Sequence, residues 1–507
     1  MNRTKQIYLF LLPIFTALYP ILFLAGHNIA QIKIVDIERS LLFAFIFAVV
    51  ISVVWILLIR SLTKGVIFSS LFLLIIESYG QIKRIMSGIY PLLGKNIIVI
   101  AVLALILLVV FIFVNRSKKS FVLICHGALF SIFCLSIVSA FPIIRNIFEQ
   151  SRLNKAYNEK ANPLDSYIGG NPDIYFIVLD SYARNDVLAD EFSFDNSLFI
   201  NNLEEMGFKL VRCSQSNYQV TMMSLVSTLN MEYVTAIPTS VGIKEVDKQY
   251  KLSRDQILGN KVWNFLKSHG YQSVAFDTGY PFSELTNATH YYPVVLKRDQ
   301  LNNFEHLLLN TTIWSVIEPH LNQLAPIKEK NVPFSEYDES PEYFYQVAKN
   351  ALNVMDDVTS LESPKFVYAH FSFPHDPYVF SENGENVIGK SIKGDPYIAQ
   401  LKYANTRITK IIQNILANSP VPPIIILESD HGYDPQNPDT RLKNLMAFYA
   451  PSSVTDSLYD TMTPVNSFRL VLSKVFSENL PLLPDYSFFS NQLGKEDFRV
   501  MPINCPK

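Results

Sequence analysis

The sequence predicts an α/β domain preceded by an N-terminal bundle of about five transmembrane helices. The sheet of the α/β domain is expected to be largely parallel and covered by helices on both faces. Long apolar stretches before residue 150 indicate the helical bundle. From residue 173 onward, short strands of the buried type alternate with amphipathic helices, which is typical of a parallel sheet. A chain of 507 residues is also too long for one ordinary domain.

The apolar stretches predict a multi-pass membrane domain at 1–145. They cover residues 7–30, 41–59, 66–77, 97–114 and 121–144. A helix needs about 20 apolar residues to cross the hydrocarbon core, so four stretches are long enough and the third is short. The stretch 97–114 has no polar face, which a helix in a soluble bundle requires. The first stretch lacks a small-x-small cleavage site, so we do not expect a cleaved signal peptide.

The polar composition of segment 146–171 predicts a linker to an α/β domain at 172–507. The runs at 174–179, 208–211, 272–276, 365–371 and 424–427 are expected strands. The segments 196–206, 221–229 and 398–416 have the spacing of helices.

Charge and cysteine content exclude some classes of function. The formal net charge is −2 and no block of five basic residues occurs, so nucleic acid is not an expected partner. Four cysteines are too few for a disulfide framework. Cys213 and Cys505 can pair if the α/β domain lies outside the cytosol, but the sequence does not show their separation.

Polar residues gather where the predicted strands end, which is where open α/β sheets bind ligands. Asp180 follows the first strand, and Asp430-His431-Gly432 follows the last. His370 and His375 belong to the end of strand 365–371, and Thr221 follows a polar loop at the start of a helix. Each residue alone has a structural alternative, such as a helix cap for Asp or Thr. Their joint occurrence at strand ends favours a metal site.

These motifs resemble the alkaline phosphatase/sulfatase superfamily over roughly 172–480. They are IVLDSY, the T-x-x-S of QVTMMSLVS, PHDPYVF and SDHG. Membrane-bound phosphotransferases such as lipoteichoic acid synthases and phosphoethanolamine transferases are the most similar. The resemblance implies that Asp180, Asp430 and His431 bind a metal and that Thr221 is both ligand and nucleophile. It further implies that His375, with His370 as a second candidate, contacts the substrate.

Departures from the sulfatase pattern favour phosphate chemistry. Threonine at 221 cannot become formylglycine, Leu225 replaces the motif arginine, and Ser181 replaces a second aspartate. We expect one divalent ion, Zn²⁺ or Mn²⁺, between which the sequence does not choose. Asn217 and Arg441 are further candidates for binding the phosphate or head group; a surface loop is the alternative for Arg441.

The expected function is a membrane-anchored transferase that moves a phospho-head group from a lipid to a surface glycan or lipid. A phosphatase or phosphodiesterase would use the same residues with water as the acceptor. A catalytically silent binding module in surface-polysaccharide assembly is a second alternative. Basic residues are almost equally divided between the loops on the two sides of the membrane, so their distribution does not predict the orientation. Only the expected reaction places the catalytic domain on the extracytoplasmic side of the inner cell membrane.

Overall fold

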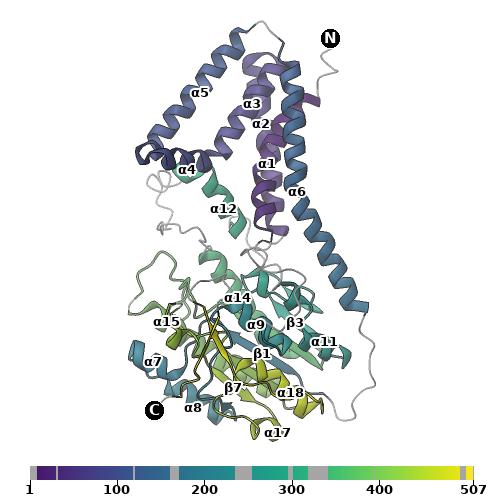
Figure 1. The fold of residues 1–507 in the computed structure, drawn as a ribbon, viewed down its shortest axis with the longest axis vertical. Helices are drawn as coiled ribbons and strands as arrows, with labels where there is room; N and C mark the ends of the chain where they lie inside the picture. The colour runs from purple at the N-terminus through teal and green to yellow at the C-terminus, as the bar shows by residue number, and fades with distance from the viewer. Residues whose placement is uncertain are drawn as a thin grey trace. The chain divides into compact units, whose positions relative to one another are not determined.

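The protein forms two compact units in the computed structural model (Figure 1). One unit comprises 1–150 with 298–340, and the other comprises 151–297 with 341–507. The structure describes residues 8–29, 32, 34–117, 120–159, 171–234, 254–294, 301–317, 341–392, 394–434, 436–490 and 498–505.

The first unit contains the apolar helices. They are α1 (Leu11–His27), α2 (Val35–Ile59), α3 (Leu62–Glu77), α4 (Tyr79–Ile89), α5 (Asn96–Arg116) and α6 (Val122–Glu159). By length and composition, four helices of the described chain can cross a membrane, at Tyr8–His27, Val35–Ile59, Asn96–Arg116 and Val122–Phe148. The pair α3 and α4 counts as a fifth span if the two are taken together, and they are bent by 64°. This bend explains why the third stretch is too short to span alone.

The end of the last apolar helix and the extent of the α/β domain differ from the sequence prediction. Helix α6 runs on to Glu159, so the first half of the expected linker is helical. Helix α12 (Asn303–Thr311) was expected within the α/β domain but groups with the apolar helices. Phe304 is buried in a cluster with α1 and α2 residues, and Glu305 pairs with Arg39 of α2. These contacts are long-range in sequence, so local patterns did not indicate them.

The second unit is built on a seven-stranded sheet within the described residues, in the order β2-β7-β6-β1-β5-β3-β4. All neighbours from β6 to β4 pair in parallel, and only β7 runs antiparallel to its neighbours. The strands are β1 (Ile174–Leu179), β2 (Lys209–Leu210), β3 (Gln272–Phe276), β4 (His290–Tyr292), β5 (Lys365–Phe371), β6 (Ile424–Glu428) and β7 (Met446–Tyr449). Strands β8 (Ser487–Phe489) and β9 (Arg499–Met501) form a separate antiparallel pair.

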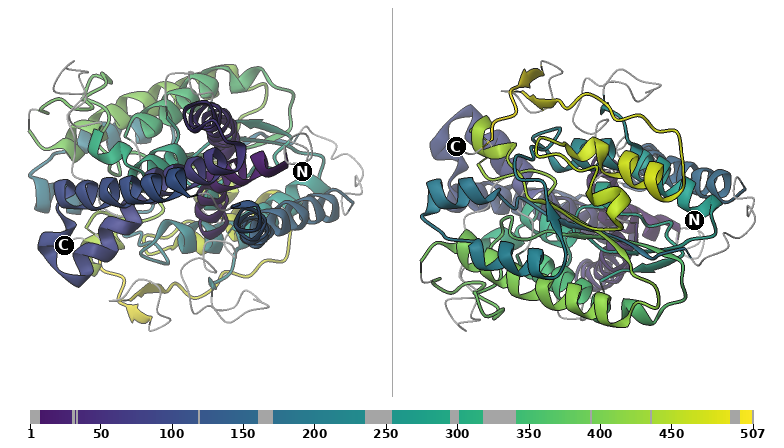
Figure 2. Two further views of the ribbon diagram at one scale, coloured as in Figure 1. Left: turned by 90° about the horizontal axis from the view of Figure 1, so that it is seen from above. Right: turned by 90° about the horizontal axis from the view of Figure 1, so that it is seen from below.

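Helices cover both faces of this sheet, as the sequence predicts (Figure 2). Alternate residues of β1 enter two different cores: Tyr175 and Ile177 lie in one, and Phe176 and Val178 in the other. The first core is shared with α7 (Asn185–Phe192), α8 (Ser197–Glu205), α14 (Pro341–Asp357) and α15 (Pro396–Asn418). The second is shared with α9 (Thr221–Asn230), α11 (Lys261–Ser268) and α18 (Ser467–Val475). Burial on both faces explains the continuous apolar strands.

Candidate functional site

The ends of β1 and β6 bring two carboxylates to one place. The strands are parallel neighbours with Val178 paired to Glu428, so both chains leave the sheet at the same edge. Asp180 and Asp430 are 1% and 2% exposed. The Ser181 amide donates to Asp430 Oδ1 over 3.0 Å. Ser181 achieves this with a φ of 62°, a backbone conformation that costs energy for a non-glycine residue and is frequent at functional sites.

These carboxylates and His370 form a cluster suited to a cation. One ligand atom from each of Asp180, His370 and Asp430 lies within 4.8 Å of the others. Among the described residues, Asp180 Oδ1, Asp430 Oδ2 and His370 Nε2 are buried atoms without a hydrogen-bond partner. Buried polar atoms normally have partners, so three unpartnered atoms in one cluster fit a binding site for a divalent ion. The donor set of carboxylates and imidazole suits such an ion.

His431 presents a lone pair to the same cluster. Its Nδ1 is 2.9 Å from the Gly432 carbonyl oxygen, so Nδ1 carries the proton and donates to that oxygen. In a neutral ring Nε2 then carries the free lone pair. That Nε2 lies 3.2 Å from Asp430 Oδ2 and 3.6 Å from Asp180 Oδ1. Burial and the nearby Arg441 charge lower the pKa of His431 well below its usual value, so the ring is neutral. A neutral imidazole is the form that binds a metal.

The Thr221 hydroxyl lies at this cluster. Its Oγ1 is 3.2 Å from His431 Nε2, although the residues are 210 positions apart in sequence. Thr221 is the first residue of the ten-residue helix α9 and is half-buried. The first amides of a helix have no partners within it, and they and the helix dipole favour a phosphate there. The residue expected to be the nucleophile is therefore next to the residues expected to bind the metal.

Arg441 and His375 bring positive charge to the site. Arg441 is 8% exposed, and its Nη2 donates to His431 Nε2 over 2.9 Å, so it is no surface-loop residue. The ring of His375 is 6.1 Å from that of His431. Burial lowers the pKa of His375, but the charges of Asp180 and Asp376 outweigh burial and raise it to about 10. Both side chains are thus cationic at neutral pH.

The two carboxylates influence each other strongly. Burial raises the pKa of Asp180, but the charge of His375 and the nearby His370 lower it to below its usual value. Burial, and then the charge of Asp180, raise the pKa of Asp430 to about 6. Two like charges held this close oppose each other's ionisation, and a cation between them would relieve that repulsion.

The Asn217 side chain makes two hydrogen bonds to the main chain of other segments. Its amide donates to the Tyr486 carbonyl and accepts from the Val465 amide, over 2.8 and 2.7 Å. The expectation that it donates to the phosphate therefore finds no support in the geometry.

One residue that the sequence interpretation missed also contacts the site. Ser283 Oγ is 3.3 Å from His370 Nδ1 and orients that ring. Glu428, two residues before Asp430, is buried and accepts from the Ser467 hydroxyl over 3.0 Å, and burial raises the pKa of its carboxyl to about 8. The only sequence signal for Ser283 is its place shortly after the strand at 272–276.

No family model matches the sequence, and no curated protein matches it. Solved structures do match. The C-terminal periplasmic domain of EcEptC from Escherichia coli, in complex with Zn, is 11% identical with a TM-score of 0.40, over 67% of this chain and 96% of that one. The soluble domain of lipooligosaccharide phosphoethanolamine transferase A from Neisseria meningitidis is 10% identical with a TM-score of 0.39, over 62% and 90%.

A protein in the alkaline phosphatase superfamily from Vibrio parahaemolyticus is 11% identical with a TM-score of 0.37, over 67% of this chain and 81% of that one. Likenesses this distant do not transfer an activity, so the function is inferred below from the side chains of the site.

Proposed function

We propose that the chain is a membrane-anchored, metal-dependent transferase of phosphate-ester head groups with Thr221 as its nucleophile. One observation carries the proposal. The Thr221 hydroxyl lies at a helix N-terminus and 3.2 Å from His431, beside the orphaned atoms of Asp180 and Asp430. A hydroxyl, a set of metal ligands and free helix amides are what phosphoryl transfer to a protein nucleophile requires.

Asp180, Asp430 and His431 would hold the ion together with the Thr221 oxygen, and His370 is close enough to contribute. When bound, a divalent ion lowers the pKa of a hydroxyl and neutralises charge on a phosphoryl oxygen. His431 Nε2 bonds to Arg441 in this structure. Arg441 would therefore release His431 to the ion and offer its guanidinium to the phosphate instead.

The remaining roles follow from charge and position. The Thr221 hydroxyl gives up its proton to solvent, and Oγ1 attacks phosphorus to form a phosphodiester between Thr221 and the head group, while the bond from phosphorus to the lipid oxygen breaks. His375, protonated at neutral pH, donates a proton to that leaving oxygen. The acceptor alcohol then attacks phosphorus and gives its proton to His375, while the bond from phosphorus to Thr221 Oγ1 breaks. The amides at the start of α9 hold the phosphoryl oxygens in both steps.

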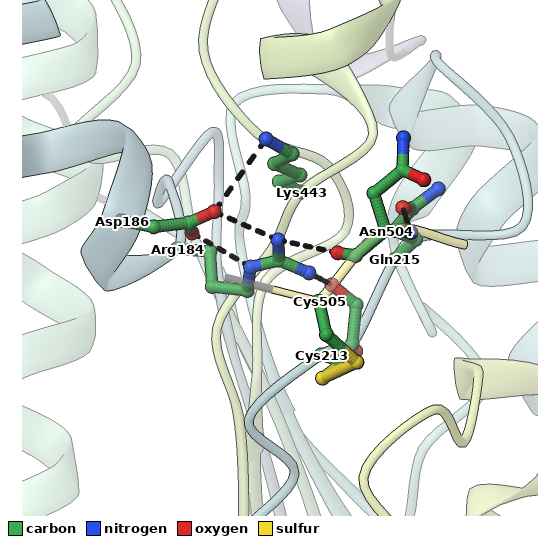
Figure 3. Close-up of a disulfide and its surroundings, with 8 residues drawn as sticks. Arg184, Asp186, Cys213, Gln215, Lys443, Asn504 and Cys505 are labelled. Carbon is green, nitrogen blue, oxygen red and sulfur yellow. Dashed lines mark hydrogen bonds and ion pairs between the residues drawn. A yellow bond between two sulfur atoms is a disulfide. The ribbon is translucent and has the colours of Figure 1, made fainter. Parts of the chain in front are cut away.

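The compartment is inferred from a disulfide in the α/β unit. Cys213 and Cys505 are bonded (Figure 3). Disulfides persist outside the cytosol and are rare within it. This supports an extracytoplasmic α/β unit on the inner membrane, where lipid donors and surface glycans are both accessible. A membrane anchor favours a lipid-borne donor, since a soluble substrate needs none.

The test uses the full chain in lipid nanodiscs loaded with zinc or manganese. Vesicles that contain a phospholipid labelled in its head group supply the donor. We expect diacylglycerol to form and label to appear on Thr221 before it reaches an acceptor glycan. Thr221→Ala should abolish both signals, whereas Thr221→Ser keeps a hydroxyl and should retain part of the activity.

Two results would change the conclusion. Release of only the free head group, with glycan present, means that water is the acceptor and the protein is a hydrolase. Full activity in Thr221→Ala removes the nucleophile from the mechanism and favours the binding-module alternative.

A further inference from the structure

The loop that leads into Thr221 contacts the described parts of the C-terminal tail, residues 486–490 and 498–505, along its length. The disulfide joins Cys213, at the start of this loop, to Cys505, which is 292 positions later in the sequence. Tyr218 forms a bridge with Phe488 of β8, and their rings stack at 5.4 Å. The proposed reaction gives the tail no role, although it contacts the segment directly before the nucleophile.

Three amide side chains at alternate positions of the loop make these contacts. Gln215 donates to the Pro502 carbonyl over 3.2 Å and accepts from the Asn504 amide over 2.8 Å. Asn217 donates to the Tyr486 carbonyl. Gln219 donates to the carbonyl of Ser490 over 2.9 Å and accepts from the amide of the same residue over 2.7 Å. An amide has both a donor and an acceptor, so it can replace a main-chain partner.

Gln219 differs from the other two because its main chain reaches the site. Its carbonyl accepts from Arg441 Nε over 2.7 Å. The same guanidinium donates to His431 Nε2, which is 3.2 Å from Thr221 Oγ1. Gln219 is also only two residues before Thr221. Gln219 therefore links Ser490 of the tail, through its side chain, to Arg441 at the site, through its main chain.

We infer that Gln219 is a positioning residue for Thr221, through which the tail segment 486–490 sets the position of the nucleophile and of Arg441. The inference rests on the proposed function. Gln219 touches no reacting atom and acts by fixing the backbone on which Thr221 and the first amides of α9 are carried. Reactions that depend on such placement lose about 100-fold in rate for a displacement of about 1 Å.

Gln215 provides a matched control. Both glutamines are buried, at 3% and 4% exposure, and both make two hydrogen bonds to the main chain of the tail. Gln215 binds the distal part of the tail near the disulfide, where Arg184 also donates to the Asn504 carbonyl (Figure 3). Alanine at either position should lower the melting temperature by a similar amount. Only a positioning role makes their effects on the reaction differ.

The experiment compares Gln219→Ala, Gln219→Glu and Gln215→Ala in the full chain, with the head-group-labelled vesicles described above. We expect Gln219→Ala to lower kcat about 10- to 100-fold with KM changed less than about twofold. Gln219→Glu keeps the acceptor for the Ser490 amide and should give an intermediate kcat. Gln215→Ala should keep kcat within about twofold of the wild type. Amide hydrogen exchange at 217–224 should rise in Gln219→Ala alone.

Equal loss of kcat in both alanine variants would overturn the inference, because a general loss of stability then explains the data. Unchanged kcat in Gln219→Ala would overturn it as well. If the wild type fails to turn over the labelled lipid, the proposed function fails, and hydrogen exchange still decides the structural claim. Equal protection of 217–224 in the two alanine variants would then refute it.

Discussion

We expect Asp430→Asn to stabilise the metal-free protein and to reduce the stability that the protein gains from metal. Asparagine has the shape of aspartate and keeps the Oδ1 acceptor that binds the amides of Ser181 and His431. It replaces Oδ2, the orphaned atom that faces the other ligands. The substitution therefore removes one charge and one ligand atom while it leaves the local backbone bonds in place.

Without metal, the variant should be more stable than the wild type at neutral pH. The pKa of Asp430 is raised in the folded protein to about 6. A carboxyl with a raised folded pKa makes folding less favourable as pH rises from its unfolded value, about 4, through the folded value. Above pH 6 the wild type carries the full cost, on the order of 2–3 kcal/mol, and asparagine does not.

With metal, the wild type gains more stability than the variant, which offsets the difference between the two metal-free proteins. At a free metal concentration about 100-fold above Kd, binding stabilises the folded wild type by about 2.7 kcal/mol. If loss of one ligand weakens binding about 100-fold, the same concentration stabilises the variant by only about 0.4 kcal/mol. For a unit of this size, each kcal/mol corresponds to about 2 °C, so the gains are about 5 °C and about 1 °C.

The assay is thermal unfolding of the full chain, with chelator and then with Zn²⁺ or Mn²⁺. His269→Gln is the control, because that ring packs on Phe265 and Phe476 and is not among the proposed ligands. It should keep the wild-type gain. An equal metal-induced gain in Asp430→Asn and the wild type would refute the assignment of the cluster as a metal centre.

Two further predictions concern other parts of the α/β unit. His375→Gln should lower kcat by a factor of about 100 or more. It should also remove the alkaline fall in activity that the wild type shows where His375 loses its proton, at a pH above the usual histidine range because nearby carboxylates raise its pKa; a pH–rate profile that keeps this fall would contradict the role. Asp173→Ala should destabilise the unit by about 3–5 kcal/mol, because it leaves the buried Lys365 ammonium without its carboxylate 2.6 Å away. Denaturant unfolding measures that loss, and the metal-induced gain should persist.

Local patterns were sufficient for the elements that carry the site. The continuous apolar runs predicted β1, β5 and β6, because strands buried on both faces need no alternation. The rule that ligands bind at strand ends then selected Asp180 and Asp430. Patterns could not place Arg441, whose role as a surface or site residue was left open. They could not detect Ser283 either, since its contact with His370 joins positions 87 residues apart.

Composition and periodicity determined by themselves that the chain has apolar helices long enough for a membrane and an α/β unit with polar strand ends. Those properties follow from side-chain chemistry along short stretches of chain. Tertiary structure alone decided that Thr221 meets His431, that α12 groups with the apolar helices and that Cys213 bonds to Cys505. Each of these depends on the folded path of a long intervening chain, which no local pattern encodes.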